Sequence, residues 1–220
     1  MPPERRYPLV VFDWDGTLCD SAATIVSCIQ DAAREMRLPV PDRARASHVI
    51  GLGLHDSLRH AVPELPQEGY REFSAHYRRF FLEREPRTTL FEGVPELLAQ
   101  LEARGHRLAV ATGKTRVGLD RALDATGLRR HFVATRCADE TAPKPAPDML
   151  YALMAELGLG AGELVMIGDT SHDLGMAAHA GVDAVAVTYG AHPAASLQAL
   201  APRGCVSSVA ELAEWLTAHA

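Results

Sequence analysis

A short apolar strand that runs into two acidic residues is the feature that most limits how this chain can fold. The run of residues 8–12 reads Pro-Leu-Val-Val-Phe and is followed by Asp13, Trp14, Asp15 and Gly16. A strand without polar positions is typical of a parallel sheet that is buried on both faces. Ligands bind at the carboxyl ends of such strands, and two carboxylates there could hold a divalent metal ion. Taken alone, the same residues also fit a solvated acidic turn.

The pattern of apolar residues changes along the chain. Residues 20–90 show helical spacing and contain no segment that we expect to be a strand. After Gly93, strand and helix patterns alternate. We expect strands at 106–112, 132–135, 164–167 and 184–187, and helices at 95–104, 115–126, 146–157, 173–180, after Pro193 and at 208–219. Such alternation predicts a parallel sheet with helices on both faces, joined by right-handed crossovers.

The sequence therefore predicts an α/β protein with a Rossmann-like parallel sheet core and an inserted, all-helical cap domain. The expected core consists of residues 1–19 and 91–220, and the expected cap consists of residues 20–90. An insertion after the first strand begins at the carboxyl edge of the sheet, so it can lie over that edge as a lid.

The composition argues against several classes of partner. The formal net charge of -6 over 220 residues disfavours a nucleic-acid binder or a protein that binds anionic membranes, so an anionic partner should be small. No apolar stretch is long enough to span a bilayer. The cysteines, Cys19, Cys28, Cys137 and Cys205, include no CxxC pair, which disfavours a zinc site and a disulfide framework. We expect a cytoplasmic monomer or homodimer.

Polar residues also follow other strands of the predicted sheet. The second expected strand runs into Thr112, and the fourth runs into Asp169 and then Asp173. Between them, Lys144 stands in a loop that is stiffened by prolines on both sides. Because parallel strands end at one edge of a sheet, the strand-end residues should lie beside the acidic pair of the first strand. Each residue also has an ordinary structural explanation, as a helix cap, a solvated loop cation or a turn acid.

With these motifs in this order, the sequence resembles the haloacid dehalogenase superfamily, in its phosphatase branch, and looks most like phosphoglycolate phosphatase-like enzymes. The residues that carry the resemblance are Asp13-Trp14-Asp15-Gly16-Thr17, Thr112, Lys144 and Gly168-Asp169 with Asp173. The resemblance covers nearly the whole chain, and the helical insertion looks like the cap of that superfamily. It implies an enzyme that hydrolyses small phosphate monoesters with Mg²⁺, with phosphoglycolate as the leading substrate.

The resemblance also implies a role for each motif residue. Asp13 would attack phosphorus and form an aspartyl-phosphate, while Asp15 would act first as general acid and then as general base. Thr112 and the amide of Gly113 would hold the transferring oxygens, and Lys144 would offset their charge. The implied metal ligands are the carboxylates of Asp13 and Asp169, the backbone carbonyl of Asp15, and Asp173 either directly or through another group.

Other positions depart from the family pattern or give weaker predictions. Many relatives have Asn after the threonine, where this chain has Gly113, and we expect Lys114 to be solvated and His172 to be exposed. The cap residues that could meet a substrate carboxylate are Gly51, Gly53, His55 and Arg45, with Arg43 and Arg59 as further candidates. A simple turn between helices, flanked by solvated arginines, is the alternative explanation of this segment.

Other reactions of the superfamily are alternatives. A dehalogenase characteristically lacks the second acid, so Asp15 argues against it, and a phosphonatase needs a cap lysine, which residues 20–90 do not contain. A sugar phosphomutase of the β-phosphoglucomutase type uses the same acids and metal, and an inorganic pyrophosphatase also fits. A catalytically silent binding module is the alternative outside catalysis, and the filled motif positions argue against it.

Overall fold

A six-stranded parallel sheet forms the centre of the protein in a computed structural model that describes residues 7–220. The strands are β1 (Leu9–Phe12), β2 (Arg107–Thr112), β3 (Ala134–Cys137), β4 (Leu164–Gly168), β5 (Asp183–Val187) and β6 (Gly204–Val206). The helices are α1 (Ala22–Glu35), α2 (Arg43–His48), α3 (Leu54–Ala61), α4 (Tyr70–Arg84), α5 (Val94–Ala103), α6 (Arg116–Thr126), α7 (Asp148–Leu157), α8 (Ser171–Ala180), α9 (Ala194–Gln198) and α10 (Val209–His219). The 3₁₀ helices are η1 (Gln67–Gly69), η2 (Glu85–Arg87), η3 (Leu128–His131) and η4 (Ala161–Glu163). Residues 1–6 of the expected core lie outside the described residues.

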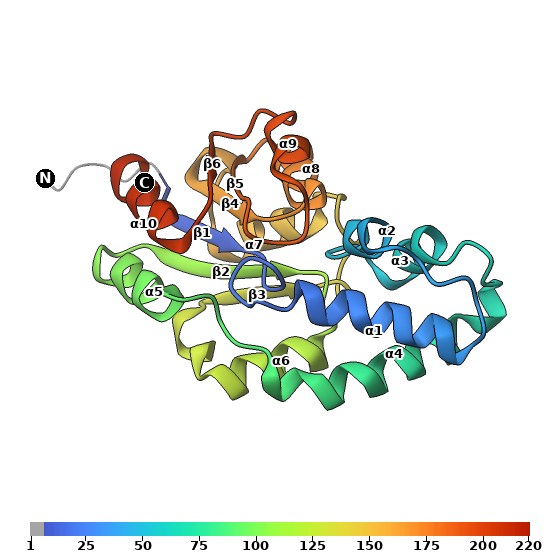
Figure 1. The fold of residues 1–220 in the computed structure, drawn as a ribbon. Coiled ribbons are helices and arrows are strands. Elements are labelled where there is room, and N and C mark those ends of the chain that lie inside the picture. The colour runs from blue at the N-terminus through green and yellow to red at the C-terminus, as the bar shows by residue number, and fades with distance from the viewer. Residues whose placement is uncertain (1–6) are drawn as a thin grey trace, which may run out of the picture.

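The strand order shows where a site can form. The order is β3-β2-β1-β4-β5-β6, and each neighbouring pair is parallel (Figure 1). Phe12 is in register with Val110 of β2 and with Ile167 of β4, so the three central strands end at nearly the same level. The order of strands reverses at β1, and ligands bind at such a reversal in open α/β sheets. The predicted α/β fold is confirmed.

Side chains that alternate along each strand build two separate core layers. Val10 and Phe12 belong to a cluster shared with α5, α6 and α10, whereas Leu9 and Val11 belong to a cluster shared with α7, α8 and α9. Because successive side chains point to opposite faces of the sheet, β1 can be buried at every position only when helices cover both faces. The apolar run at the start of the chain is therefore the centre of the core.

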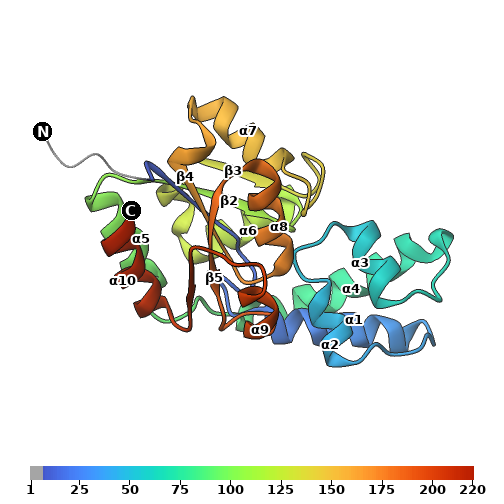
Figure 2. The same cartoon turned by 90° about the horizontal axis from the view of Figure 1, so that it is seen from above.

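The helices α1 to α4 lie together at one end of the sheet, beyond the carboxyl ends of the strands (Figures 1 and 2). They enclose a third hydrophobic cluster, which includes Ile29, Leu58 and Phe73. The chain leaves and re-enters the sheet through neighbouring segments, since Cys19 forms an antiparallel bridge with Leu90. The helical segment thus has its own core and joins the rest of the protein through two adjacent connections.

Two of the boundaries that differ from the expected ones have their reason in local hydrogen bonds. β3 begins at Ala134 because the backbone N–H of Phe132 still belongs to the 3₁₀ turn before it. α8 begins at Ser171, two residues before the expected start at Asp173, because Thr170 caps the helix. The Thr170 hydroxyl accepts from the Asp173 N–H, and the Asp173 carboxylate accepts from the Thr170 N–H.

The last strand, β6, has no counterpart among the expected elements. It spans Gly204–Val206 and pairs with β5, and its glycine and exposed Cys205 conceal any apolar run. Within residues 7–220, no helix has the length and apolarity that crossing a membrane requires. The four cysteines are free.

Candidate active site

Asp13 is buried at the end of β1, with one carboxylate oxygen fixed and the other free. Its Oδ1 atom accepts a hydrogen bond from the Trp14 N–H at 2.6 Å and lies 3.0 Å from the Nζ atom of Lys144. Its Oδ2 atom is buried and has no hydrogen-bond partner among residues 7–220. Because buried carboxylate oxygens are nearly always satisfied, this atom marks a place for a ligand or a metal ion.

Asp169 follows β4 and is held at both carboxylate oxygens. Its Oδ1 atom accepts from the Thr17 hydroxyl at 2.8 Å, and its Oδ2 atom accepts from the Ala191 N–H at 2.7 Å. Gly16 and Gly190 make room for it, since a Cβ atom on either would lie 2.1 Å or 2.3 Å, respectively, from Asp169 Oδ2. Gly16 also has φ +79°, a conformation that favours glycine. Gly16, which follows Asp15, therefore leaves the space that the Asp169 side chain occupies.

Lys144 is fully buried between two acids, so it is not a solvated loop cation. Its Nζ atom lies 3.0 Å from Asp13 Oδ1 and 2.6 Å from Asp173 Oδ1. Burial disfavours the ammonium ion, but the two carboxylates outweigh burial and raise the pKa of Lys144. The other oxygen of Asp173 accepts from the Thr170 N–H at 3.0 Å and from its hydroxyl at 2.7 Å. Asp173 thus holds the lysine while the start of α8 holds Asp173.

Acids outnumber cations at this edge of the sheet. Carboxylate oxygens of Asp13, Asp169 and Asp173 lie within 4.8 Å of one another. Burial raises the pKa of Asp13 to about 7, although Lys144 opposes the shift. Burial and the neighbouring carboxylates raise the pKa of Asp169 well above its ordinary range. A divalent cation would offset this excess of negative charge, and oxygen atoms are the ligands that hard cations prefer. The residues present therefore fit a divalent metal ion.

Asp15 lies in the same loop, but its carboxylate has different partners. Its Oδ1 atom accepts the Ser21 hydroxyl at 2.6 Å and lies 3.1 Å from the Nζ atom of Lys114. The expectation that Lys114 is solvated is wrong, because its ammonium is largely buried and also lies 4.7 Å from the ring centroid of Phe81 on α4. Lys114 therefore connects Asp15 to the helical segment.

The second motif, Thr112 and Gly113, lies against the helical segment. Thr112 is buried at the end of β2. Gly113 has no room for a side chain, because a Cβ atom there would lie 2.7 Å from the carbonyl oxygen of Gly51. A Cβ atom on Gly53 would lie 2.8 Å from Pro143, so this glycine also approaches a core loop. A side chain such as that of Asn would not fit at position 113 in this arrangement.

The charged cap candidates lie away from these motifs. Arg43, Arg45, His55 and Arg59 are exposed. The ring of His55 lies 3.1 Å from the Gln67 amide. None of the four forms a hydrogen bond or an ion pair with a motif residue within the described part of the chain. Of the cap predictions, the structure brings the two glycines to the site and leaves the cationic side chains at the surface.

Some residues at this edge gave no signal in the sequence. Ser21 is the residue before α1, and its hydroxyl binds Asp15 instead of the helix backbone. The expectation that His172 is exposed is wrong, since it is 8% exposed and its Nε2 atom lies 2.7 Å from the carbonyl oxygen of His48. The contact of His172 joins α8 to α2, so it depends on how the helical segment packs on the core.

The chain is similar to known proteins both in sequence and in structure. The model of a family described as "Haloacid dehalogenase-like hydrolase" matches residues 10–187. The chain is 39% identical over 212 residues to "Probable phosphatase IndB" of Dickeya dadantii (strain 3937), across 93% of this chain and 91% of that one. It is 37% identical to "Tyrosine-protein kinase PtkA" of Mycobacterium tuberculosis (strain ATCC 25618 / H37Rv), across 86% of this chain and 64% of that protein. A crystal structure described as "a predicted phosphoglycolate phosphatase from haemophilus somnus 129pt" is similar with a TM-score of 0.84 and 26% identity, across 95% of this chain and 97% of that one.

Proposed function

Since the chain belongs to the haloacid dehalogenase-like hydrolase family, we propose that it is a phosphatase that releases inorganic phosphate from small phosphate monoesters and requires Mg²⁺. The observation that supports the proposal most directly is the free Oδ2 atom of Asp13, buried beside Lys144 at the carboxyl edge of the sheet. An oxygen that is held in place without a donor keeps its lone pairs for attack on phosphorus. The fold alone would not select this reaction.

Hydrolysis would proceed in two steps at Asp13. In the first, Asp13 Oδ2 forms a bond to phosphorus, the ester P–O bond breaks, and the departing oxygen takes a proton from Asp15. In the second, a water oxygen attacks phosphorus and gives a proton to Asp15, and the bond to Asp13 breaks. The contacts of Asp15 with Ser21 and Lys114 are both made by its Oδ1 atom, so Oδ2 would be the atom that exchanges the proton. Lys144 stays beside Asp13 and offsets the charge of the transferring group.

Mg²⁺ suits this site because the site is negative and its donors are oxygens. A carboxylate and a phosphate about 4 Å apart repel by roughly 4 kcal/mol per pair of unit charges in a partly screened site. Asp13 and Asp169 would hold the ion with the backbone carbonyl of Asp15, and the ion would supply charge stabilisation of the phosphoryl oxygens. Each oxygen of Asp169 accepts one hydrogen bond and so keeps a lone pair for the ion. Asp173 is more fully engaged, since its Oδ1 atom pairs with the Lys144 ammonium and its Oδ2 atom accepts two bonds from Thr170, which favours a role through Lys144 over direct ligation.

We further propose that residues 20–90 act as a cap over a core of residues 1–19 and 91–220 and limit the site to small substrates. The carbonyl of Gly51 lies against Gly113, and Gly53 lies against Pro143. The helical segment therefore leaves little space above these two loops, which carry Thr112 and Lys144. Phosphoglycolate is the leading substrate, and the name of the solved relative from Haemophilus somnus supports this choice. A small phosphorylated metabolite is the partner that we propose, for a chain that works as a monomer or homodimer in the cytoplasm.

The test is phosphate release from a metabolite panel, measured with Mg²⁺ and after removal of metal with EDTA. The panel contains phosphoglycolate, sugar phosphates and pyrophosphate, and sugar-phosphate isomerisation is followed in parallel. We expect release from small monoesters only when Mg²⁺ is present. Isomerisation without free phosphate would favour a mutase, and release from pyrophosphate alone would favour a pyrophosphatase. Tyrosine phosphorylation from ATP without monoester hydrolysis would favour an activity like the one named for PtkA. Each of these three outcomes would overturn the proposal.

Replacing Gly113 by alanine should impair turnover without unfolding the core. The added Cβ atom would lie 2.7 Å from the Gly51 carbonyl oxygen, so the motif loop and the helical segment must move apart. A displacement of about 1 Å in catalytic geometry costs roughly 100-fold in rate, and we expect kcat for phosphate release to fall by about that factor. Gly162→Ala is the matched control, because a Cβ atom at Gly162 would meet no atom within 4 Å. Unchanged kcat in Gly113→Ala would show that this contact is absent during turnover.

A further inference from the structure

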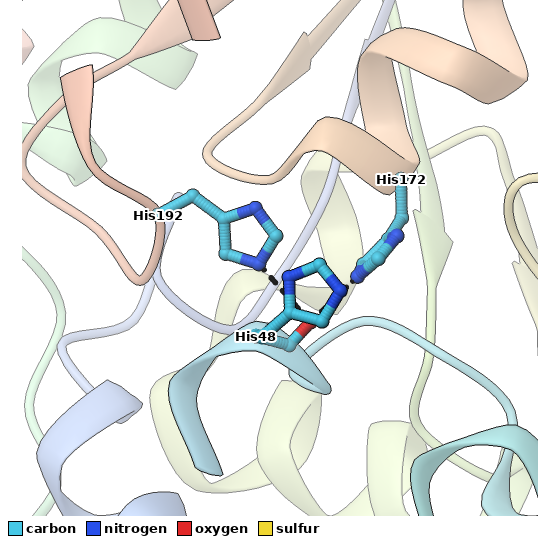
Figure 3. Close-up of side chains that lie close together, drawn as sticks. All are labelled: His48, His172 and His192. Carbon is cyan, nitrogen blue, oxygen red and sulfur yellow. Dashed lines mark hydrogen bonds between the residues drawn. The ribbon is translucent and has the colours of Figure 1, made fainter. Parts of the chain in front are cut away.

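Three histidines from distant parts of the chain meet where the helical segment touches the core. His48 is the last residue of α2, His172 lies in the first turn of α8, and His192 follows β5. The ring centroid of His48 lies 5.2 Å from those of the other two, which are 5.1 Å apart (Figure 3). His172 and His192 are buried, whereas His48 is exposed. None of the three takes part in the proposed reaction.

Hydrogen bonds define how the two buried rings are oriented. The backbone carbonyl of His48 lies 2.7 Å from the Nε2 atom of His172 and 3.1 Å from the Nε2 atom of His192, so both rings donate to one oxygen. The Ser171 N–H donates to Nδ1 of His192 at 3.0 Å. An imidazole that accepts at Nδ1 and donates at Nε2 is neutral. The ring of His48 forms no hydrogen bond among residues 7–220, and its lone pair is free.

We propose that His48, His172 and His192 form a second metal site, which takes one borderline transition-metal ion of the Zn²⁺ class. Each residue can offer one ring nitrogen, and these nitrogens lie within 4.8 Å of one another. A tetrahedral zinc ion with bonds of about 2.0–2.1 Å needs its nitrogen ligands about 3.4 Å apart, so rotation of the rings closes the difference. Imidazole ligands select Zn²⁺, Ni²⁺ or Cu²⁺ over Mg²⁺, which makes this site chemically distinct from the carboxylate cluster.

Solvent can reach two of the three histidines from one side. A pocket of about 550 Å³ is lined by His48 and His192, together with Arg43, Ser171 and Ser196. Three histidine ligands leave one tetrahedral position, and a water from this pocket can fill it. The cysteine pattern disfavours a zinc site in the sequence, and this site uses none of the cysteines.

Metal binding must replace the present hydrogen bonds. Coordination through Nε2 moves the proton of each buried ring to Nδ1, so the bonds to the His48 carbonyl are lost. The Ser171 N–H also loses its acceptor on His192. Three hydrogen bonds are thus exchanged for three metal–nitrogen bonds when the ion binds. The bound ion would join α2 of the helical segment to α8 and the loop after β5.

The test is titration of tag-free protein with Zn²⁺ in excess Mg²⁺, followed by calorimetry, and with Co²⁺, followed by visible absorption. We expect one Zn²⁺ per chain at this site and the intense Co²⁺ bands of a four-coordinate, nitrogen-rich site. His48→Ala should weaken Zn²⁺ binding by at least about tenfold and abolish the Co²⁺ bands. Because His48 is exposed, this variant should fold, and circular dichroism checks that it does. Carboxylate-bound Co²⁺ would give only weak bands, so the aspartate cluster cannot mimic the result.

His60→Ala is the matched control, because His60 is an exposed imidazole of the same helical segment, 6.5 Å from His48 between ring centroids. Binding that is unchanged in His48→Ala, or weakened equally in His60→Ala, would overturn the proposal. A second readout rests on the proposed function: Zn²⁺ should inhibit Mg²⁺-dependent phosphate release by wild-type protein and less so by His48→Ala. Equal inhibition of both proteins would exclude an effect of this site on turnover. If no phosphatase activity is found, the Zn²⁺ and Co²⁺ titrations still test the site.

Discussion

Replacing Asp13 by asparagine should lower kcat for phosphate release by at least about 10⁴-fold, because the amide has no carboxylate oxygen to attack phosphorus. The amide keeps the size of the side chain, so substrate can still enter the site. The loss is measured with the best substrate of the metabolite panel at saturating Mg²⁺. Asp20→Asn is the matched control, since Asp20 is an exposed acid a few residues further along the chain. Turnover within about tenfold of wild type in Asp13→Asn would eliminate Asp13 as the nucleophile.

The same substitution should leave the metal-free protein at least as stable as wild type. Burial raises the pKa of Asp13 from its ordinary value of 3.8 to about 7. Ionisation of this carboxyl therefore opposes folding, and the opposition grows as pH rises from about 4 to about 7. Asparagine removes that charge, and Lys144 keeps Asp173 as its partner. A thermal unfolding midpoint at pH 8 that is equal to or above that of wild type separates lost chemistry from lost fold.

Replacing Lys144 by methionine should impair both activity and stability. Its ammonium is fully buried between Asp13 and Asp173, so its removal leaves two buried carboxylates without a cation. Breaking a buried ion pair in this way costs about 3–5 kcal/mol, measured as the free energy of unfolding in urea. We expect kcat to fall by roughly 10³-fold, as for the loss of one charge-stabilising donor at a reacting oxygen.

A surface ion pair provides the control for Lys144→Met. Arg129 is exposed and pairs with Asp120 and Asp124 on α6. Arg129→Met should therefore cost less than about 1 kcal/mol and leave kcat unchanged. Lys144→Arg should not restore activity, because the planar guanidinium cannot replace a compact ammonium between two carboxylates. A Lys144→Met protein as stable as wild type would contradict the buried position of this lysine.

Local patterns in the sequence were enough to predict the fold and the positions of the motifs. The apolar run before Asp13 and the alternation after Gly93 predicted a parallel sheet, and the strands place Asp13 and Asp169 side by side. The roles implied for these residues stay predictions until the substitutions above are made. Patterns failed where an element is short or begins with a polar turn, as in β6 and at the start of α8.

Contacts between the helical segment and the core could not be predicted from local patterns. The sequence predicted a solvated Lys114 and an exposed His172, and both lie in the boundary between α2, α4 and the core. In the sequence, Gly113 was only a departure from the family pattern, whereas its position against Gly51 shows that a side chain is excluded there. No local pattern reports such contacts, because each joins segments that are far apart in the chain.

The amino-acid sequence by itself determined which residues end the strands, since burial on both faces requires apolar runs and parallel strands end at a single edge. Only the tertiary structure decided which oxygen of Asp13 is free, which lysine is buried and which histidines meet. The physical reason is that these properties depend on side-chain direction and on the packing of the helical segment against the core, where shifts of an ångström or two make or break a contact.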